Sequence, residues 1–79
     1  MSAPASHRLL MIDDDENLSA MLAEYLAPMG MELHACTHAQ IGLERLAAEH
    51  FDALVLDIML PDVDGLEVCR RVRAISDIP

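Results

Sequence analysis

The stretch from Leu54 to Gly65 constrains the fold of this 79-residue chain more than any other. It begins with an apolar run, reaches a carboxylate at Asp57, and then turns at Pro61 and Gly65. A short apolar run bounded by turn residues predicts a strand buried on both faces, as in the interior of a parallel sheet. Ligands of open α/β sheets bind at the carboxyl ends of the strands, so Asp57 is predicted to lie at the rim of such a crevice.

The rest of the chain predicts a regular alternation of strands and helices. The apolar residues 9–12 form a second buried strand that runs into Asp13-Asp14-Asp15-Glu16, and residues 31–36 alternate as in an edge strand. Apolar spacing of three and four residues predicts helices over 17–30, from a Thr37/Gln40 capping box to Ala48, and over 64–75. Asp15 is the expected N-cap of the first helix. The inward faces are predicted to carry Leu18, Met21, Leu22, Tyr25, Leu26 and Met29; Leu43, Leu46 and Ala47; and Val68, Cys69, Val72 and Ile75.

The order β-α-β-α-β-α predicts an α/β fold with a parallel sheet and right-handed crossovers. With the first strand between the other two, strand order 2-1-3, the two continuous apolar strands are neighbours and the alternating strand lies at the edge. That order places Asp13, Asp14 and Asp57 side by side at a topological switch point.

Composition limits the possible functions. The formal charge is −9, and all five basic residues are arginines, so the chain lacks the clustered cations that bind nucleic acid. No apolar run approaches the roughly 20 residues that cross a membrane. Cys36 and Cys69 occur at no metal-ligand spacing and predict reduced thiols in a cytoplasmic protein. The four histidines are expected at the surface or at a strand edge, away from the acidic crevice.

Three adjacent carboxylates repel one another unless protons or a cation offset their charge. Mg²⁺ prefers oxygen ligands, and a metal beside Asp57 would offset the charge of an incoming phosphoryl group, which the carboxylate could attack to form an acyl phosphate. The alternative for Asp13-Asp14-Asp15 alone is a set of helix N-caps favoured by the helix dipole.

With these motifs the chain resembles the receiver domain of two-component response regulators. The likeness lies in residues 9–12 with Asp13-Asp14-Asp15 and in residues 54–68, and it extends over nearly the whole chain from Arg8 onward. The resemblance implies a flavodoxin-like (CheY-like) doubly wound parallel sheet. It divides the chain into a flexible N-terminus, 1–7, and a partial receiver domain, 8–79, truncated after its third helix.

The resemblance also implies residue roles. Asp57 would be the phosphoacceptor for a sensor histidine kinase, and Mg²⁺ the cofactor. Asp14 and Asp57 would be metal ligands, Asp13 a ligand through water, and Met59 a ligand through its main-chain oxygen. Three parts of the family site have no counterpart in this chain: the hydroxyl residue after strand four, the lysine after strand five, and the aromatic switch residue.

Partners follow from the same resemblance. The loop after Asp57 is similar to receivers joined to winged-helix DNA-binding domains, so the parent protein is expected to regulate transcription, with DNA contacted outside this chain. An unpaired edge on the third strand predicts a homodimer. Two other classes remain open: an aspartyl-phosphate-forming phosphatase-like enzyme, although Asp57-Ile58-Met59 lacks its second acid, and an inert assembly module.

Overall fold

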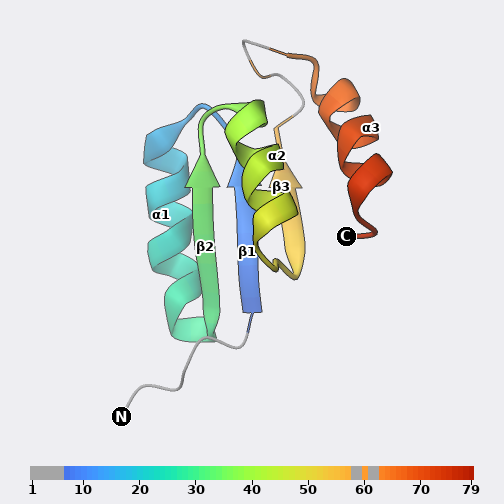
Figure 1. Cartoon of the computed structure of the whole chain (residues 1–79). Coiled ribbons are helices and arrows are strands. Elements are labelled where there is room, and N and C mark those ends of the chain that lie inside the picture. The colour runs from blue at the N-terminus through green and yellow to red at the C-terminus, as the bar shows by residue number, and fades with distance from the viewer. Residues whose placement is uncertain (1–6, 58–59, 61–62) are drawn as a thin grey trace.

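The computed structural model describes residues 7–57, 60 and 63–79. The elements follow the predicted order, with a short 3-10 helix after the first α-helix. They are β1 (His7–Ile12), α1 (Glu16–Leu26), η1 (Ala27–Met29), β2 (Met31–Cys36), α2 (Ala39–Ala48), β3 (Ala53–Leu56) and α3 (Gly65–Ile75) (Figure 1). β1 begins at His7, before the apolar run 9–12 from which the strand was predicted. No helix in the described ranges is long and apolar enough to span a membrane.

The three strands form one parallel sheet in the order β2-β1-β3, which confirms the predicted topology. Ile12, the last residue of β1, is in register with Cys36 of β2 and with Leu56 of β3. The three strands therefore end at the same edge of the sheet, and residues that follow them emerge side by side (Figure 1).

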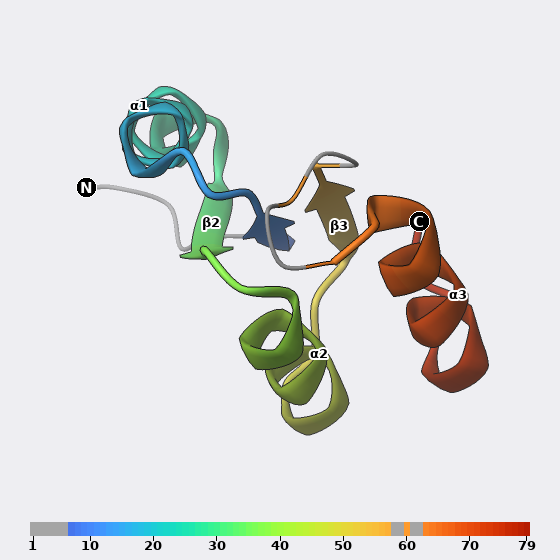
Figure 2. The same ribbon diagram turned by 90° about the horizontal axis from the view of Figure 1, so that it is seen from above.

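Helices cover both faces of the sheet. Figure 2 shows α1 on one face and α2 with α3 on the other. The central strand β1 is covered from both sides: Leu10 and Ile12 have no exposed surface, and Met11 is 2% exposed. This burial confirms the prediction from the continuous apolar run 9–12, because both sets of alternating side chains need apolar neighbours.

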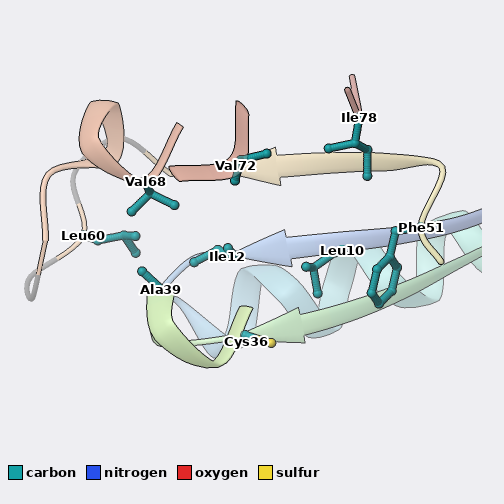
Figure 3. Packing of buried hydrophobic residues seen from close by; sticks show 9 residues of the cluster. All are labelled: Leu10, Ile12, Cys36, Ala39, Phe51, Leu60, Val68, Val72 and Ile78. Atoms are coloured by element: carbon teal, nitrogen blue, oxygen red, sulfur yellow. The ribbon is translucent and has the colours of Figure 1, made fainter. Parts of the chain in front are cut away.

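The main core lies between the sheet and the α2/α3 layer (Figure 3). Val68 and Val72, four residues apart on α3, point toward the sheet and are 0% and 2% exposed. Cys69 and Ile75 were predicted to be buried with them, but both are exposed. The buried residues of α3 are Gly65, Val68 and Val72, which lie on one narrow stripe of the helix, and Cys69 and Ile75 lie outside that stripe. Both cysteines are free thiols, as predicted, with Cys36 buried.

α1 begins where it was predicted to begin, but fewer of its apolar side chains are buried than predicted. The side chain of Asp15 accepts a hydrogen bond from the Leu18 backbone N–H, at 3.0 Å, and so caps the helix. The predicted inward stripe is too wide, because Met21, Tyr25 and Met29 are 61%, 64% and 53% exposed. In both ribbon views α1 lies toward the outer side of β2, and no second described helix packs beside it on that face (Figures 1 and 2).

The start of α2 corrects another prediction. His38 is the N-cap, without a side-chain capping bond, and the Thr37 hydroxyl lies 3.0 Å from Nδ1 of His38. The predicted Thr37/Gln40 capping box is therefore wrong. Leu43 and Leu46 pack against the core as predicted, whereas Ala47 is exposed. The buried residues of α2 are Ala39 and Gly42.

A polar network joins several elements at the end of the sheet where β1 and β3 begin, opposite the end that carries Asp13 and Asp57. The guanidinium of Arg45 donates to both carboxylate oxygens of Glu49, at 2.9 and 3.1 Å, and Arg8 donates to the same carboxylate at 2.8 Å. Both guanidinium carbons lie over the ring of Phe51, 4.8 and 5.5 Å from its centroid. His34 stacks edge-on against Phe51, half-buried in the edge strand.

This network predicts a dependence of stability on pH. Hydrogen bonds from Arg45 and then Arg8 lower the pKa of Glu49 from 4.5 to about 2. A carboxylate whose pKa is lower in the folded state stabilises the fold at pH values above its pKa in the unfolded chain. That stabilisation disappears as pH falls through the pKa of the folded state.

We expect the Glu49→Gln variant to unfold at a lower urea concentration than wild type at pH 6, with the difference vanishing toward pH 2. Glu44→Gln, at an exposed site on the same helix, is the control. A pH-independent difference between Glu49→Gln and wild type would contradict the assignment.

Candidate functional site

The predicted acidic residues follow directly from two neighbouring strands. The N–H of Asp13 donates to the carbonyl of Cys36 at 3.0 Å, and the N–H of Asp57 donates to the carbonyl of Ile12 at 2.9 Å. The sheet hydrogen bonding therefore continues one residue past β1 and β3. Because these bonds hold the backbone of both aspartates, their side chains are anchored to the most buried part of the protein.

The structure brings Asp13, Asp14 and Asp57 together, as the strand order predicted. One carboxylate oxygen from each lies within 4.8 Å of the other two, and this is the only such group of potential metal ligands within 7–57, 60 and 63–79. Asp13 and Asp57 are half-buried, whereas Asp14 is exposed. The cluster therefore reaches solvent through Asp14, while Asp13 and Asp57 are partly covered.

The neighbouring Asp15 has a different task. Its carboxylate caps α1, and its own N–H donates to Oδ1 of Asp13 at 2.9 Å. The helix-capping alternative therefore applies to Asp15, while Asp13 and Asp14 remain available to face Asp57. One Asp13 oxygen is oriented by this bond, which leaves the other for a ligand.

The donor set fits a hard divalent cation. Three carboxylates at such short separations repel one another, and a bound cation would offset that repulsion. Mg²⁺ binds carboxylate oxygens while it keeps several waters. Two half-buried acids and one exposed acid leave open positions for such waters. The fourth predicted ligand, the main-chain oxygen of Met59, lies outside the described residues.

Gly42 is a structural contributor that the sequence prediction missed. A Cβ atom added at Gly42 would lie 2.6 Å from Cγ1 of Ile12, the residue directly before Asp13. Contact at this distance is well inside van der Waals separation, so the absence of a side chain lets α2 approach the end of β1. The only sequence signal was a glycine inside a helical pattern, which often marks a packing constraint.

Comparison with known proteins agrees with this geometry. Residues 9–79 match the family model of the response regulator receiver domain. Response regulator MprA of Mycobacterium ulcerans is 40% identical over 72 residues, which are 91% of this chain and 31% of MprA. Transcriptional regulatory protein AfsQ1 of Streptomyces coelicolor is 38% identical over 71 residues, 90% of this chain and 32% of AfsQ1. The chain thus spans about a third of the length of these relatives.

Solved structures show the same fold. The complex of histidine kinase ThkA with response regulator TrrA matches with a TM-score of 0.84 and 30% identity, covering 91% of this chain and 63% of the matched chain. TrrA of Thermotoga maritima in complex with Mg(2+)-BeF matches with a TM-score of 0.79 and 31% identity, covering 86% of this chain and 59% of that one. Family model, strand order and the acidic cluster agree: the chain belongs to the response regulator receiver domain family.

Proposed function

We propose that this receiver domain accepts a phosphoryl group on Asp57 in a magnesium-dependent reaction, with the phosphohistidine of a sensor histidine kinase as donor. The observation that carries the proposal is the approach of Asp13, Asp14 and Asp57 to within 4.8 Å of one another at the strand ends. Receiver domains are not classed as enzymes, and the role here is that of a switch.

The chemistry follows from the position of Asp57. A carboxylate oxygen of Asp57 attacks phosphorus, the P–N bond to the donor imidazole breaks, and the imidazole keeps the bonding electron pair and takes up a proton. The bonding of the Asp57 backbone to Ile12 fixes the origin of the nucleophile. Its half-buried side chain restricts the directions from which a donor can approach.

The remaining acids suit the binding of the cofactor. We assign Asp14 and Asp57 as direct Mg²⁺ ligands, Asp13 as a ligand through water, and the main-chain oxygen of Met59 as a further ligand. When bound, Mg²⁺ would offset the charge of the phosphoryl oxygens beside the attacking carboxylate. Asp13 is positioned for its role by the hydrogen bond from the Asp15 N–H.

Kinase and output are proposed from the relatives. TrrA has been solved in complex with histidine kinase ThkA, and AfsQ1 is a transcriptional regulatory protein. We propose a sensor histidine kinase as partner and a cytoplasmic parent protein that regulates transcription through DNA contacts outside this chain. The net charge of −9 supports placing the DNA contacts elsewhere.

A homodimer through the β3 edge stays a prediction, and the structure narrows the surface available for it. The N–H of Leu54 donates to the carbonyl of Pro79 at 2.9 Å. Because Asp57 bonds toward β1, the alternate residues Leu54 and Leu56 direct their peptide groups to the free side of β3. Pro79 therefore occupies part of the edge through which a second chain would pair.

The test is a magnesium titration with and without beryllofluoride, a phosphoryl mimic, followed by amide NMR. We expect saturable shifts centred on Asp13, Asp14 and Asp57 with Mg²⁺, and a second set at Asp57 only when beryllofluoride is added. These residues share one edge of the sheet, so the shifts should fade toward His7 at the other end of β1.

Three outcomes would contradict the proposal. Absence of any response to Mg²⁺ would indicate an assembly module whose carboxylates only support the fold. Sustained hydrolysis of a phosphate ester, through repeated phosphorylation and dephosphorylation of Asp57, would indicate a phosphatase-like enzyme. Binding of Mg²⁺ without beryllofluoride shifts would mean that the metal half of the site forms but Asp57 cannot accept the group.

A further inference from the structure

Three side chains of types that can bind a metal lie near one another at the other end of the sheet, where the strands begin. His7 is the first residue of β1, and Asp52 directly precedes β3. Nε2 of His50 lies 3.2 Å from Oδ1 of Asp52, and Nδ1 of His7 lies 3.9 Å from Oδ2 of the same carboxylate. Two imidazoles from separate segments thus flank one carboxylate.

Asp52 is held firmly in this arrangement. Its Oδ2 accepts a hydrogen bond of 2.7 Å from the backbone N–H of Arg8. Its Oδ1 lies 3.2 Å from Nε2 of His50. The carboxylate is therefore held in position by a backbone group and by one of the imidazoles.

The surroundings do not supply a competing cation. The guanidinium of Arg8 is bonded to Glu49, to the carbonyl of His50 and, at 3.4 Å, pairs with Glu32. Its positive charge is thus matched by two carboxylates, which leaves the charge of Asp52 uncompensated except by the histidines. Both imidazoles reach solvent, since the side chains of His7 and His50 are 59% and 82% exposed.

We propose that His7, His50 and Asp52 bind a borderline transition-metal ion, Zn²⁺ in the first instance. Two imidazoles and a carboxylate with water in the remaining position form a common tetrahedral zinc set, whereas Mg²⁺ disfavours imidazole. Among the described residues only the Asp13 cluster already has three ligand atoms within 4.8 Å, so here the exposed rings must turn toward the ion. Rotation of exposed side chains costs little. The ion would connect the start of β1 to the start of β3.

The test is a titration with Co²⁺, as a spectroscopic substitute, and with Zn²⁺ by calorimetry, both in saturating Mg²⁺ to occupy the acidic cluster. We expect one equivalent of Zn²⁺ to bind, with intense visible Co²⁺ absorption typical of tetrahedral coordination. His50→Gln and His7→Gln should each weaken Zn²⁺ binding by about tenfold or more, the loss of one coordinating group. His50 is too exposed for its replacement to unfold the chain.

His38→Gln is the matched control, because His38 is exposed at the start of α2 and, among the bonds described, its side chain contacts only the Thr37 hydroxyl. It should leave Zn²⁺ affinity unchanged. Three results would overturn the proposal: unaltered affinity in both His7→Gln and His50→Gln, loss of Zn²⁺ binding as Mg²⁺ is raised, or octahedral Co²⁺ spectra. Competition by Mg²⁺ would place the zinc at the acidic cluster instead, so this test is separate from that of the phosphoacceptor.

Discussion

Replacing Asp57 with asparagine is expected to abolish phosphorylation. The amide removes the attacking oxygen while keeping the size of the side chain and the backbone bond to Ile12. The protein is incubated with acetyl phosphate and Mg²⁺, and intact mass spectrometry follows the addition of one HPO₃. Wild type should gain this mass and lose it on raising the pH, as an acyl phosphate does, and Asp57→Asn should gain none.

Asp64→Asn is the matched control for this experiment. The side chain of Asp64 caps α3 by accepting from the Leu66 N–H at 3.0 Å, and asparagine caps a helix as well. This variant should be modified at the wild-type rate. Phosphorylation of Asp57→Asn at the wild-type rate would show that another carboxylate is the acceptor, and the assignment of Asp57 would be wrong.

Loss of one acid from the cluster is expected to weaken Mg²⁺ binding strongly. Asp13→Asn and Asp14→Asn each remove one negative charge beside Asp57, and we expect the Kd for Mg²⁺ to rise about tenfold or more, equivalent to about 1.4 kcal/mol per tenfold. Asp13→Asn keeps a carbonyl oxygen that can accept from the Asp15 N–H, so the local backbone should be preserved. Calorimetry or amide shifts give the Kd directly.

Asp15→Asn provides a control within the same acidic run. Asp15 accepts from the Leu18 N–H and is absent from the metal-ligand group, and asparagine can still cap α1. Its Mg²⁺ affinity should stay within about twofold of wild type, a change below about 0.5 kcal/mol by the same conversion. An equal loss in Asp15→Asn, Asp13→Asn and Asp14→Asn would indicate general attraction by negative charge instead of a coordinated ion.

The two charged regions of the domain divide function from stability. At the strand ends, backbone bonds from Asp13 to β2 and from Asp57 to β1 place three carboxylates close together, where we propose that Mg²⁺ binds. At the strand starts, Arg8 and Arg45 share Glu49 and compensate its charge within the protein. Acidic groups are therefore gathered where we propose that a cation binds, and a carboxylate is paired with arginines where the elements are joined.

The sequence by itself determined the strand order and the acidic cluster. Residues 9–12 and 54–57 each combine an apolar run with a terminal carboxylate, and the carboxyl ends of parallel strands share one edge. Local sequence carries this information for β1, whose consecutive apolar residues are buried on both faces. The same prediction was wrong for β3, where Val55 is 45% exposed. The N-cap Asp15 could be predicted from the sequence because capping involves residues only two or three positions apart. Asp64 was predicted to begin α3 and is instead its N-cap.

Only the tertiary structure decided which apolar residues are covered. Met21 and Tyr25 repeat with helical spacing, yet they are exposed because α1 has no second described helix beside it on its face of the sheet. Other contacts join residues that are far apart in the chain. Arg8 and Arg45 both bond to Glu49, Gly42 lies close to Ile12, and Pro79 bonds to β3. Such contacts depend on how elements are placed against one another, and periodicity along one element carries no record of that placement.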